Sequence, residues 1–333
     1  MNIWKGILNA FMLAAVFGCS MGTSKKDSSG EVVEQLPRLC VTGTQLMNEK
    51  GDTVVLKGVS YGWHQFWPRF YNASTVAYLT KDWGAQVLRA SMGIELDTAY
   101  LERPQMGIDC VQKVVDAAID NDVYVIIDWH SHGIRQEEAK DFFAKMATRY
   151  KGVPNVIYEI FNEPVDDSWE QVKAYSVEVI KTIRAIEPEA VILVGCPHWD
   201  QDIHLAADDP ITGYNNIMYT VHFYANTHGQ WLRDRTDYAL GKGLPVFVSE
   251  CAGMEASGDG AINKEEWQNW LDWMQRCSIS WVAWSVSDKD ETCSMLLPSA
   301  SSEGNWKDKD LKEWGRMVRD CVLYTSDAAD ERS

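Results

Sequence analysis

Short apolar runs alternate with amphipathic stretches along most of this chain. The runs are rich in β-branched residues and nearly free of charge, which is typical of parallel strands buried on both faces. Eight candidate strands result: Val54–Val59, Ala85–Arg89, Val123–Asp128, Val156–Phe161, Val191–Gly195, Ile217–His222, Val246–Glu250 and Ser280–Trp284. Before the first of them, Leu39–Met47 and Thr53–Val59 flank a turn signal at Asn48–Asp52, which predicts an N-terminal β-hairpin.

Helical periodicity separates most of these runs. The predicted helices are Thr75–Asp82, Ile108–Asn121, Glu137–Tyr150, Trp169–Ile186, Trp231–Gly241 and Lys264–Gln275, with a short turn at Asp202–Ala207 and a last helix at Lys309–Arg319. Eight strand–helix units predict an α/β fold of the closed (β/α)₈ barrel type, which usually takes about 250 residues. We expect one such domain over residues 37–320. A doubly wound open sheet is the alternative, but Gly58–Gly62 lacks the glycine spacing of a phosphate-binding turn.

Polar side chains gather where these strands end. Glu163 and Glu250 each follow an apolar strand, and a charged group beside a dry, packed strand is usually paired or functional. The other strand ends carry His64, Arg89, Asp128, His130, Asn162, His198, His222, Tyr224 and Trp284. In a barrel of this type all of these ends meet at one mouth, where the active site is built. Two carboxylates at one mouth suggest a pair that acts on glycosidic bonds.

The composition of the chain limits the classes of substrate and partner that it can bind. The chain has 333 residues and a formal net charge of −17, which argues against nucleic acid or an anionic membrane surface as a partner and fits a neutral substrate. It also has 15 tryptophans. Some are expected in the core, but an indole also offers a flat apolar platform with a polar edge, which suits a sugar ring. Trp63, Trp67, Trp129 and Trp199 are the platform candidates.

The two ends of the chain carry separate signals. Residues 1–19 are predicted to be a lipoprotein-type signal peptide, with Lys5 before an apolar core and Gly18-Cys19 at a lipidation site. Residues 20–36 have the composition of a flexible tether. We therefore expect an exported cell-envelope lipoprotein, periplasmic or associated with the outer membrane, or a secreted protein. Residues 322–333 resemble the translation of a sequencing adapter.

Seven cysteines follow Cys19, which is an odd number, and none has the spacing of a Cys-x-x-Cys motif. At least one thiol is therefore expected to be unpaired within the chain. Cys110, Cys196 and Cys251 lie in or beside apolar runs and are predicted to be small buried hydrophobic residues. The sequence assigns no disulfide.

The strand-end residues, taken in order, resemble glycoside hydrolase family 5, a family of retaining (β/α)₈ enzymes. The resemblance rests on Leu88-Arg89, Asp128-Trp129-His130, Asn162-Glu163-Pro164, His222-Phe223-Tyr224, Ser249-Glu250 and Trp284, and the stretch around Trp281–Thr292 is similar to bacterial endo-β-1,4-glucanases. It covers Leu39 to Arg319. It implies Glu163 as general acid/base, Glu250 as nucleophile, Asn162 on the sugar 2-OH, His130 and His222 on hydroxyls, and Trp284 stacked under the sugar.

The two predicted catalytic roles require different protonation states of the two carboxyl groups. Glu163 must begin protonated, so we expect burial and the negative charge of Glu250 to raise its pKa. Glu250 must stay ionised, with Arg89 as its cation and Tyr224 as a hydrogen-bond donor. The segment after the first strand departs from the family pattern, because its polar and aromatic residues, Trp63, His64 and Trp67 among them, stand in a different order. They are kept as substrate-binding candidates.

Two alternatives use the same barrel. His130-Ser131-His132, with His222 and Asp288, is a possible metal-ligand set for a metal-dependent hydrolase. A non-catalytic glycan-binding lipoprotein is the second, although both glutamates are present. The function predicted is a monomeric, retaining endo-β-1,4-glucanase that cuts internal bonds of cellulose or mixed-linkage β-glucan without a cofactor or metal. Mannan and xyloglucan remain open as substrates.

Overall fold

The computed structural model describes the backbone of residues 25–26, 32–33 and 36–330, and the side chains of residues 36–324. The predicted signal peptide and nearly all of the predicted tether therefore lie outside the described residues. No helix within the described part has the length and apolar character needed to cross a membrane.

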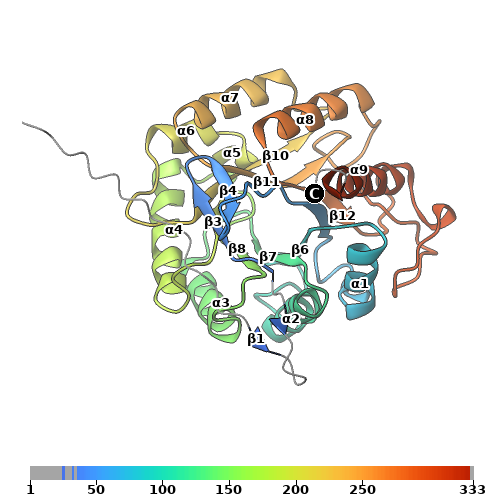
Figure 1. The fold of residues 1–333 in the computed structure, drawn as a ribbon, viewed down its shortest axis with the longest axis horizontal. Coiled ribbons are helices and arrows are strands. Elements are labelled where there is room, and N and C mark those ends of the chain that lie inside the picture. The colour runs from blue at the N-terminus through green and yellow to red at the C-terminus, as the bar shows by residue number, and fades with distance from the viewer. Residues whose placement is uncertain (1–24, 27–31, 34–35, 331–333) are drawn as a thin grey trace, which may run out of the picture.

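Eight parallel strands close into a barrel that is surrounded by helices (Figure 1). The barrel strands are β5 (Lys57–Tyr61), β6 (Val87–Gly93), β7 (Tyr124–His130), β8 (Val156–Glu159), β9 (Ile192–Val194), β10 (Ile217–Tyr224), β11 (Val246–Ala252) and β12 (Trp281–Val286). The barrel closes where β12 pairs with β5 and Ala283 lies opposite Val59. The predicted fold class is confirmed.

Apart from a short helix at Pro197–Asp200, which was not predicted, the helices lie close to their predicted positions. They are α1 (Ala73–Lys81), α2 (Pro104–Asp120), α3 (Gln136–Arg149), α4 (Trp169–Arg184), α5 (Pro197–Asp200), α6 (Ile203–Asp208), α7 (Gln230–Gly241), α8 (Lys264–Cys277) and α9 (Glu313–Asp330), with 3₁₀ turns at Pro68–Phe70 and Asp308–Asp310. Helix α4 begins at a capping box in which Ser168 and Gln171 bond reciprocally. Helix α9 starts later than predicted, and its backbone continues to Asp330, within the segment that resembles an adapter.

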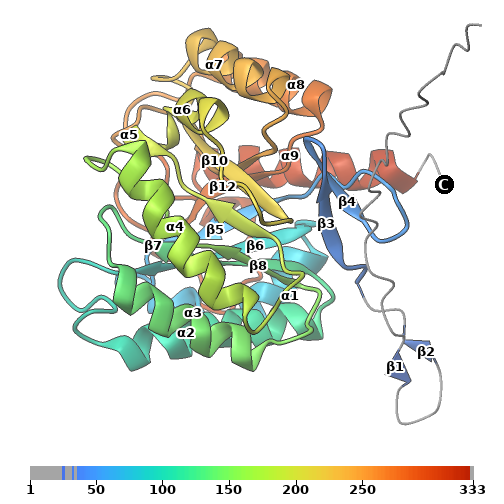
Figure 2. The same ribbon diagram turned by 90° about the vertical axis from the view of Figure 1, so that its left-hand side faces the viewer.

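The predicted turn at Asn48–Asp52 is present, with Met47 and Thr53 in an antiparallel bridge across it. What the sequence did not predict is a further turn that divides Leu39–Met47 into the two strands of the N-terminal hairpin. Strands β3 (Leu39–Thr42) and β4 (Gln45–Asn48) turn at Gly43, whose φ of 60° suits a glycine. The Asn48–Asp52 signal makes a second turn after the hairpin, closed by a bond from Gly51 N–H to the Asn48 carbonyl. The hairpin covers one end of the barrel (Figure 2), where Leu39 and Leu46 pack with inward side chains from the beginnings of the strands.

The inward-facing side chains of the barrel change from apolar to polar along the strands, and the polar ones form the site. Because side chains alternate with a period of two, every second residue of a strand points inward. In β6 the inward series runs from Val87 to Arg89 to Ser91, and in β7 from Ile126 to Asp128 to His130. The apolar members belong to the layer beneath the hairpin, and the polar members follow toward the C-terminal end.

Candidate active site

A cleft of about 660 Å³ opens at the C-terminal end of the barrel. It is lined by Trp63, Phe66, Trp67, His130, His132, Glu163, Tyr224, Glu250, Ala256, Ser257, Gly258, Trp284, Lys289, Glu291 and Cys293. Of the predicted substrate-binding residues, Trp63, Trp67, His130, Tyr224 and Trp284 therefore reach the cleft, together with both predicted catalytic glutamates.

Glu163 and Glu250 both line the cleft at the C-terminal end of the barrel. Glu163 lies past the end of β8 and is 13% exposed, whereas Glu250 lies within β11 and is 4% exposed. One carboxylate oxygen of each residue, with a ring nitrogen of His222, falls in a set whose members all lie within 4.8 Å of one another. That separation fits a retaining glycosidase, whose carboxyls are about 5–5.5 Å apart, and is too short for an inverting one at about 6.5–9.5 Å.

Two donors hold the predicted nucleophile. Arg89 Nη1 donates to Glu250 Oε2 at 2.9 Å, and the Tyr224 hydroxyl donates to Oε1 at 2.7 Å. Both contacts were predicted from the sequence. Burial, with the charge of Glu163, raises the pKa of Glu250 above its usual value, and His222, Arg89 and Tyr224 limit that rise.

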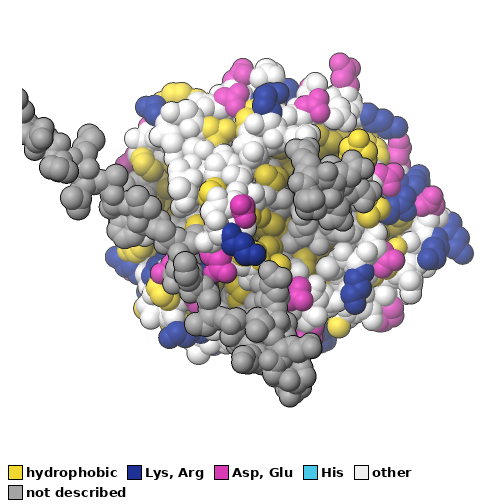
Figure 3. Space-filling view, viewed as in Figure 1, with side chains coloured by type: hydrophobic (Ala, Val, Ile, Leu, Met, Phe, Trp, Pro, Cys, Tyr) yellow, Lys and Arg dark blue, Asp and Glu magenta, His cyan; other side chains and the backbone are white. Residues whose placement is uncertain are grey.

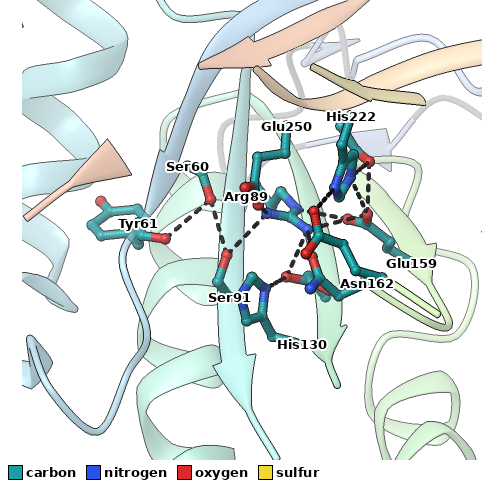
Figure 4. Close-up of polar contacts among 12 residues, drawn as sticks. Ser60, Tyr61, Arg89, Ser91, His130, Glu159, Asn162, His222 and Glu250 are labelled. Carbon is teal, nitrogen blue, oxygen red and sulfur yellow. Dashed lines mark hydrogen bonds and ion pairs between the residues drawn. The ribbon is translucent and has the colours of Figure 1, made fainter. Parts of the chain in front are cut away.

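Arg89 is the centre of a wider buried network (Figure 4). Its side chain is inaccessible to solvent and also binds Glu159 at 2.7 Å, Asp128 at 3.0 Å and the Asn162 Oδ1 atom at 2.7 Å. Sequence reasoning missed Glu159, because it lies inside the apolar run Val156–Phe161, which was predicted as one buried strand. A charge in the middle of such a run was the available signal.

Glu163 is held by two histidines, one on each oxygen. His222 Nδ1 lies 2.8 Å from Oε1, and His132 Nε2 lies 3.3 Å from Oε2. Burial alone would raise the pKa of Glu163, but the hydrogen bonds from the histidines lower it well below its usual range. The expected direction for Glu163 was therefore wrong, because sequence reasoning counted burial and Glu250 and left out both imidazoles. His132, which carried no predicted role in the glycosidase mechanism, contacts the acid/base directly.

Three further predicted substrate-binding residues, His130, Asn162 and His64, lie in or behind the wall of the cleft. His130 stacks on Trp284 with ring centroids 5.2 Å apart, and its Nδ1 lies 2.7 Å from Asp128 Oδ2. Asn162 is fully buried and its Nδ2 has no hydrogen-bond partner among the described residues, so it keeps a free donor beside Arg89. His64 is also fully buried; its Nδ1 accepts from Gly93 N–H, and burial lowers its pKa to about 4. The structure thus places His64 behind the cleft wall.

The alternative metal-ligand set is not assembled. Asp288 pairs with Arg69 at 2.7 Å, and His130 is engaged by Asp128. Among the described residues, the group whose ligand atoms converge is Glu163, His222 and Glu250. These three side chains form the carboxylate pair and its histidine, and the absence of a cofactor stays a prediction.

Barrel fold, cleft and carboxylate pair together define a retaining glycoside hydrolase. Residues 47–290 match the model of the cellulase family, glycosyl hydrolase family 5. Endoglucanase A of Evansella cellulosilytica is 42% identical over 95% of this chain, and endoglucanase N of Pectobacterium atrosepticum is 40% identical over 93%. The chain spans 65% and 70% of the lengths of those two relatives.

Solved structures agree with these matches. A structure from Cytophaga hutchinsonii superposes with a TM-score of 0.87 at 41% identity, covering 89% of this chain and 97% of that one. An endoglucanase catalytic domain from Thermobifida fusca gives 0.82 at 33% identity, covering 86% and 97%. This chain therefore belongs to glycosyl hydrolase family 5, as the resemblance of its strand-end residues predicted.

Proposed function

We propose that this protein hydrolyses internal β-1,4 bonds of a neutral glucan by double displacement, with Glu163 as acid/base and Glu250 as nucleophile. The observation that carries the proposal is the close approach of the two carboxylates within the cleft. The names of its relatives, which are endoglucanases, support the substrate class, and the Thermobifida fusca domain has also been solved with cellotetraose.

The proposed mechanism gives each bond change to a residue. In the first step a Glu250 oxygen bonds to the anomeric carbon, the bond to the leaving oxygen breaks, and Glu163 gives its proton to that oxygen. In the second step Glu163 takes a proton from water, the water oxygen bonds to the anomeric carbon, and Glu250 is released. Arg89 and Tyr224 hold both oxygens of Glu250 and favour its ionised form.

The proton that Glu163 must donate is shared with His222. Their facing atoms are 2.8 Å apart, so one proton lies between an imidazole nitrogen and a carboxylate oxygen. In the free enzyme the neighbouring carboxylates raise the pKa of His222 well above its usual value and place that proton on the imidazole. Transfer to Glu163 is then a short movement along an existing hydrogen bond, and the pair must keep its single proton for the first step to proceed.

The aromatic side chains of the cleft suit stacked sugar rings. Trp284 presents a ring that is already stacked on His130, and Trp63 contacts His130 edge-on with ring centroids 4.7 Å apart. Phe66 is 49% exposed beside Trp67 on the same rim. With the free Asn162 amide, these groups supply apolar platforms and a hydrogen-bond donor for neutral sugars.

The test is reducing-sugar release from soluble mixed-linkage β-glucan by the wild type, Glu163→Gln and Glu250→Gln. Each substitution is expected to lower kcat by about 10³-fold or more. With an aryl cellobioside whose phenol leaves without protonation, Glu163→Gln should still release one equivalent of phenol in a burst, because only the nucleophile is needed. Glu250→Gln should show no burst. The reverse pattern would exchange the two roles, and full activity in both variants would overturn the proposal.

Mannan and xyloglucan are compared in the same assay, because the 2-OH orientation and the branches of these polymers test the cleft directly. Hydrolysis of mannan or xyloglucan at a higher kcat/KM than β-glucan would correct the substrate. Wild-type silence on all three polymers would favour the glycan-binding alternative, and loss of activity on chelation would favour the metal-dependent one.

We also propose export with a lipid anchor at Cys19, and action as a monomer. The support is the run from Lys5 through Gly18-Cys19. Full-length protein expressed in a Gram-negative host should take up labelled palmitate in the membrane fraction, and Cys19→Ser should not. Equal labelling of both proteins would contradict the anchor. Size-exclusion chromatography with light scattering tests the monomer, and a dimer mass would contradict it.

A further inference from the structure

Asp200 is a buried carboxylate that the double-displacement mechanism leaves without a role. It lies at the end of α5, directly after β9, and its side chain is inaccessible to solvent. The backbone that delivers it is unusual: His198, Trp199 and Asp200 have φ values of 58°, 54° and 59°. Residues with a Cβ adopt this left-handed conformation only at an energetic cost, so the surrounding structure must hold the segment in place.

The two oxygens of Asp200 have different surroundings. Oδ1 accepts a hydrogen bond from the backbone N–H of Cys196 at 2.5 Å. Oδ2 lies 3.3 Å from His222 Nδ1 and has no hydrogen-bond partner among the described residues. A fully buried, unsatisfied carboxylate oxygen is costly, and its nearest charged neighbour is the imidazole that binds Glu163.

His222 is surrounded by carboxylates from several elements. Glu163 and Asp200 face Nδ1, while Glu159 of β8 lies 3.7 Å from Nε2. Glu250 of β11 also acts on this imidazole, and Arg89 is the cation that pairs with both Glu159 and Glu250.

The hydroxyl of Ser249 determines which ring nitrogen keeps its hydrogen. Its Oγ lies 2.9 Å from His222 Nε2 and donates to Glu159 Oε1 at 2.7 Å, so it accepts from Nε2–H. The proton at Nδ1 is therefore the one shared with Glu163, and Asp200 Oδ2 lies next to it.

We propose that Asp200 is a positioning residue that acts on Glu163 through His222, by keeping the proton of the His222–Glu163 pair in place. The inference rests on the proposed double displacement, in which this pair must hold one proton. A negative charge beside the pair favours the protonated form, so it raises the pH at which the proton is lost. Asp200 thereby extends activity to higher pH.

The electrostatic balance agrees with this arrangement. Burial alone would lower the pKa of His222, but Asp200, Glu159 and Glu163 together raise it well above its usual value. Burial also raises the pKa of Asp200 well above its usual value, and the His222 charge opposes that rise without cancelling it. Because the two facing groups act on each other's charge at 3.3 Å, a change at Asp200 should be felt at His222.

The experiment compares kcat/KM against pH for the wild type, Asp200→Asn and Asp202→Asn on soluble mixed-linkage β-glucan. In Asp200→Asn, the amide oxygen can still accept from Cys196 N–H, which turns the amide NH₂ toward His222 Nδ1. The alkaline limb should move to lower pH by about one unit or more, a tenfold loss of kcat/KM above that limb. The acidic limb, which reports Glu250, should stay in place.

Asp202→Asn is the matched control. It removes the same charge from the same segment, but Asp202 is partly exposed and pairs with Arg235 instead of His222. Its pH profile should match the wild type. A folded Asp200→Asn whose alkaline limb also matches the wild type would overturn the proposal and reduce Asp200 to a partner of Cys196.

A second measurement needs neither a variant nor activity. In ¹⁵N-histidine NMR of the wild-type protein, His222 should remain protonated on both ring nitrogens well above the ordinary histidine pKa of about 6.5. If His222 titrates at or below that value, the proposal fails even where Asp200→Asn does not fold. A high His222 pKa in a protein that cuts no glucan would separate failure of the proposed function from failure of this inference.

Discussion

Tyr224 illustrates how much a single hydroxyl contributes to this site. It donates to Glu250 Oε1, and a donor to the charged form of a carboxylate lowers its pKa. Glu250 must be ionised to attack, so activity is lost as the pH falls through its pKa. Tyr224→Phe removes the donor, which should raise the pKa of Glu250 and move the acidic limb of kcat/KM to higher pH by about one unit.

The control for this prediction is Tyr238→Phe. Tyr238 also donates to a carboxylate, Asp208, at 2.5 Å, but on the outer surface of the barrel. The same atom is removed there without touching the cleft, so the pH profile should equal that of the wild type. An unchanged acidic limb in Tyr224→Phe would contradict this prediction and leave the charge of Glu250 to His222 and Arg89.

Residue identities at the site could be predicted better than their protonation. Glu163 and Glu250 follow apolar runs, and the partners Arg89 and Tyr224 could be inferred because a nucleophile needs a cation and a donor. The direction of the Glu163 pKa could not, since it depends on where two imidazoles point. His132 and His222 lie 31 and 59 residues from Glu163 in sequence, and no local pattern shows that their ring nitrogens meet its oxygens.

At the scale of elements, the barrel strands were predicted, but several predicted ranges end before the strands do. The predicted ends at Arg89, Asp128 and Glu250 fall where each apolar run stops, whereas β6, β7 and β11 continue for two to four residues. Backbone pairing between parallel strands does not require apolar side chains. The inward charges are satisfied by one another around Arg89, which is a property of the closed barrel that one strand's sequence does not reveal.

Gly58 allows strands β5 and β6 to approach each other closely. A Cβ placed there would lie 1.7 Å from the backbone carbonyl oxygen of Val87, which pairs with Gly58 across β5 and β6. Gly58→Ala should therefore force the strands apart and reduce the free energy of unfolding by about 3 kcal/mol or more. Urea denaturation followed by circular dichroism measures this loss.

Gly241→Ala is the matched substitution at the exposed end of α7. A Cβ there meets nothing within 4 Å, so this variant should be neutral or more stable by about 0.5–1 kcal/mol. Equal stability of the two variants would mean that β5 and β6 adjust without cost, and that the close approach at Gly58 does not constrain the barrel.

For the whole molecule, the net charge of −17 has a consequence that depends on the polymer offered. Acidic and basic side chains are interspersed around the face shown in Figure 3, so the excess negative charge belongs to no single patch on that face. A neutral glucan approaches such a protein without electrostatic work. Carboxymethyl-cellulose carries its own negative charges and is repelled over a distance that salt controls.

Raising the salt concentration from about 10 mM to about 100 mM shortens the screening length from about 30 Å to about 10 Å. The value of kcat/KM on carboxymethyl-cellulose should then rise several-fold, while that on neutral mixed-linkage β-glucan should change by less than about twofold. Initial rates at fixed pH and temperature measure both. The neutral polymer serves as the control, because it meets the same cleft and the same catalytic pair. An equal rise on both polymers would place the salt effect in the protein itself, at the charged groups around Glu163 and Glu250, and not in the encounter with the substrate.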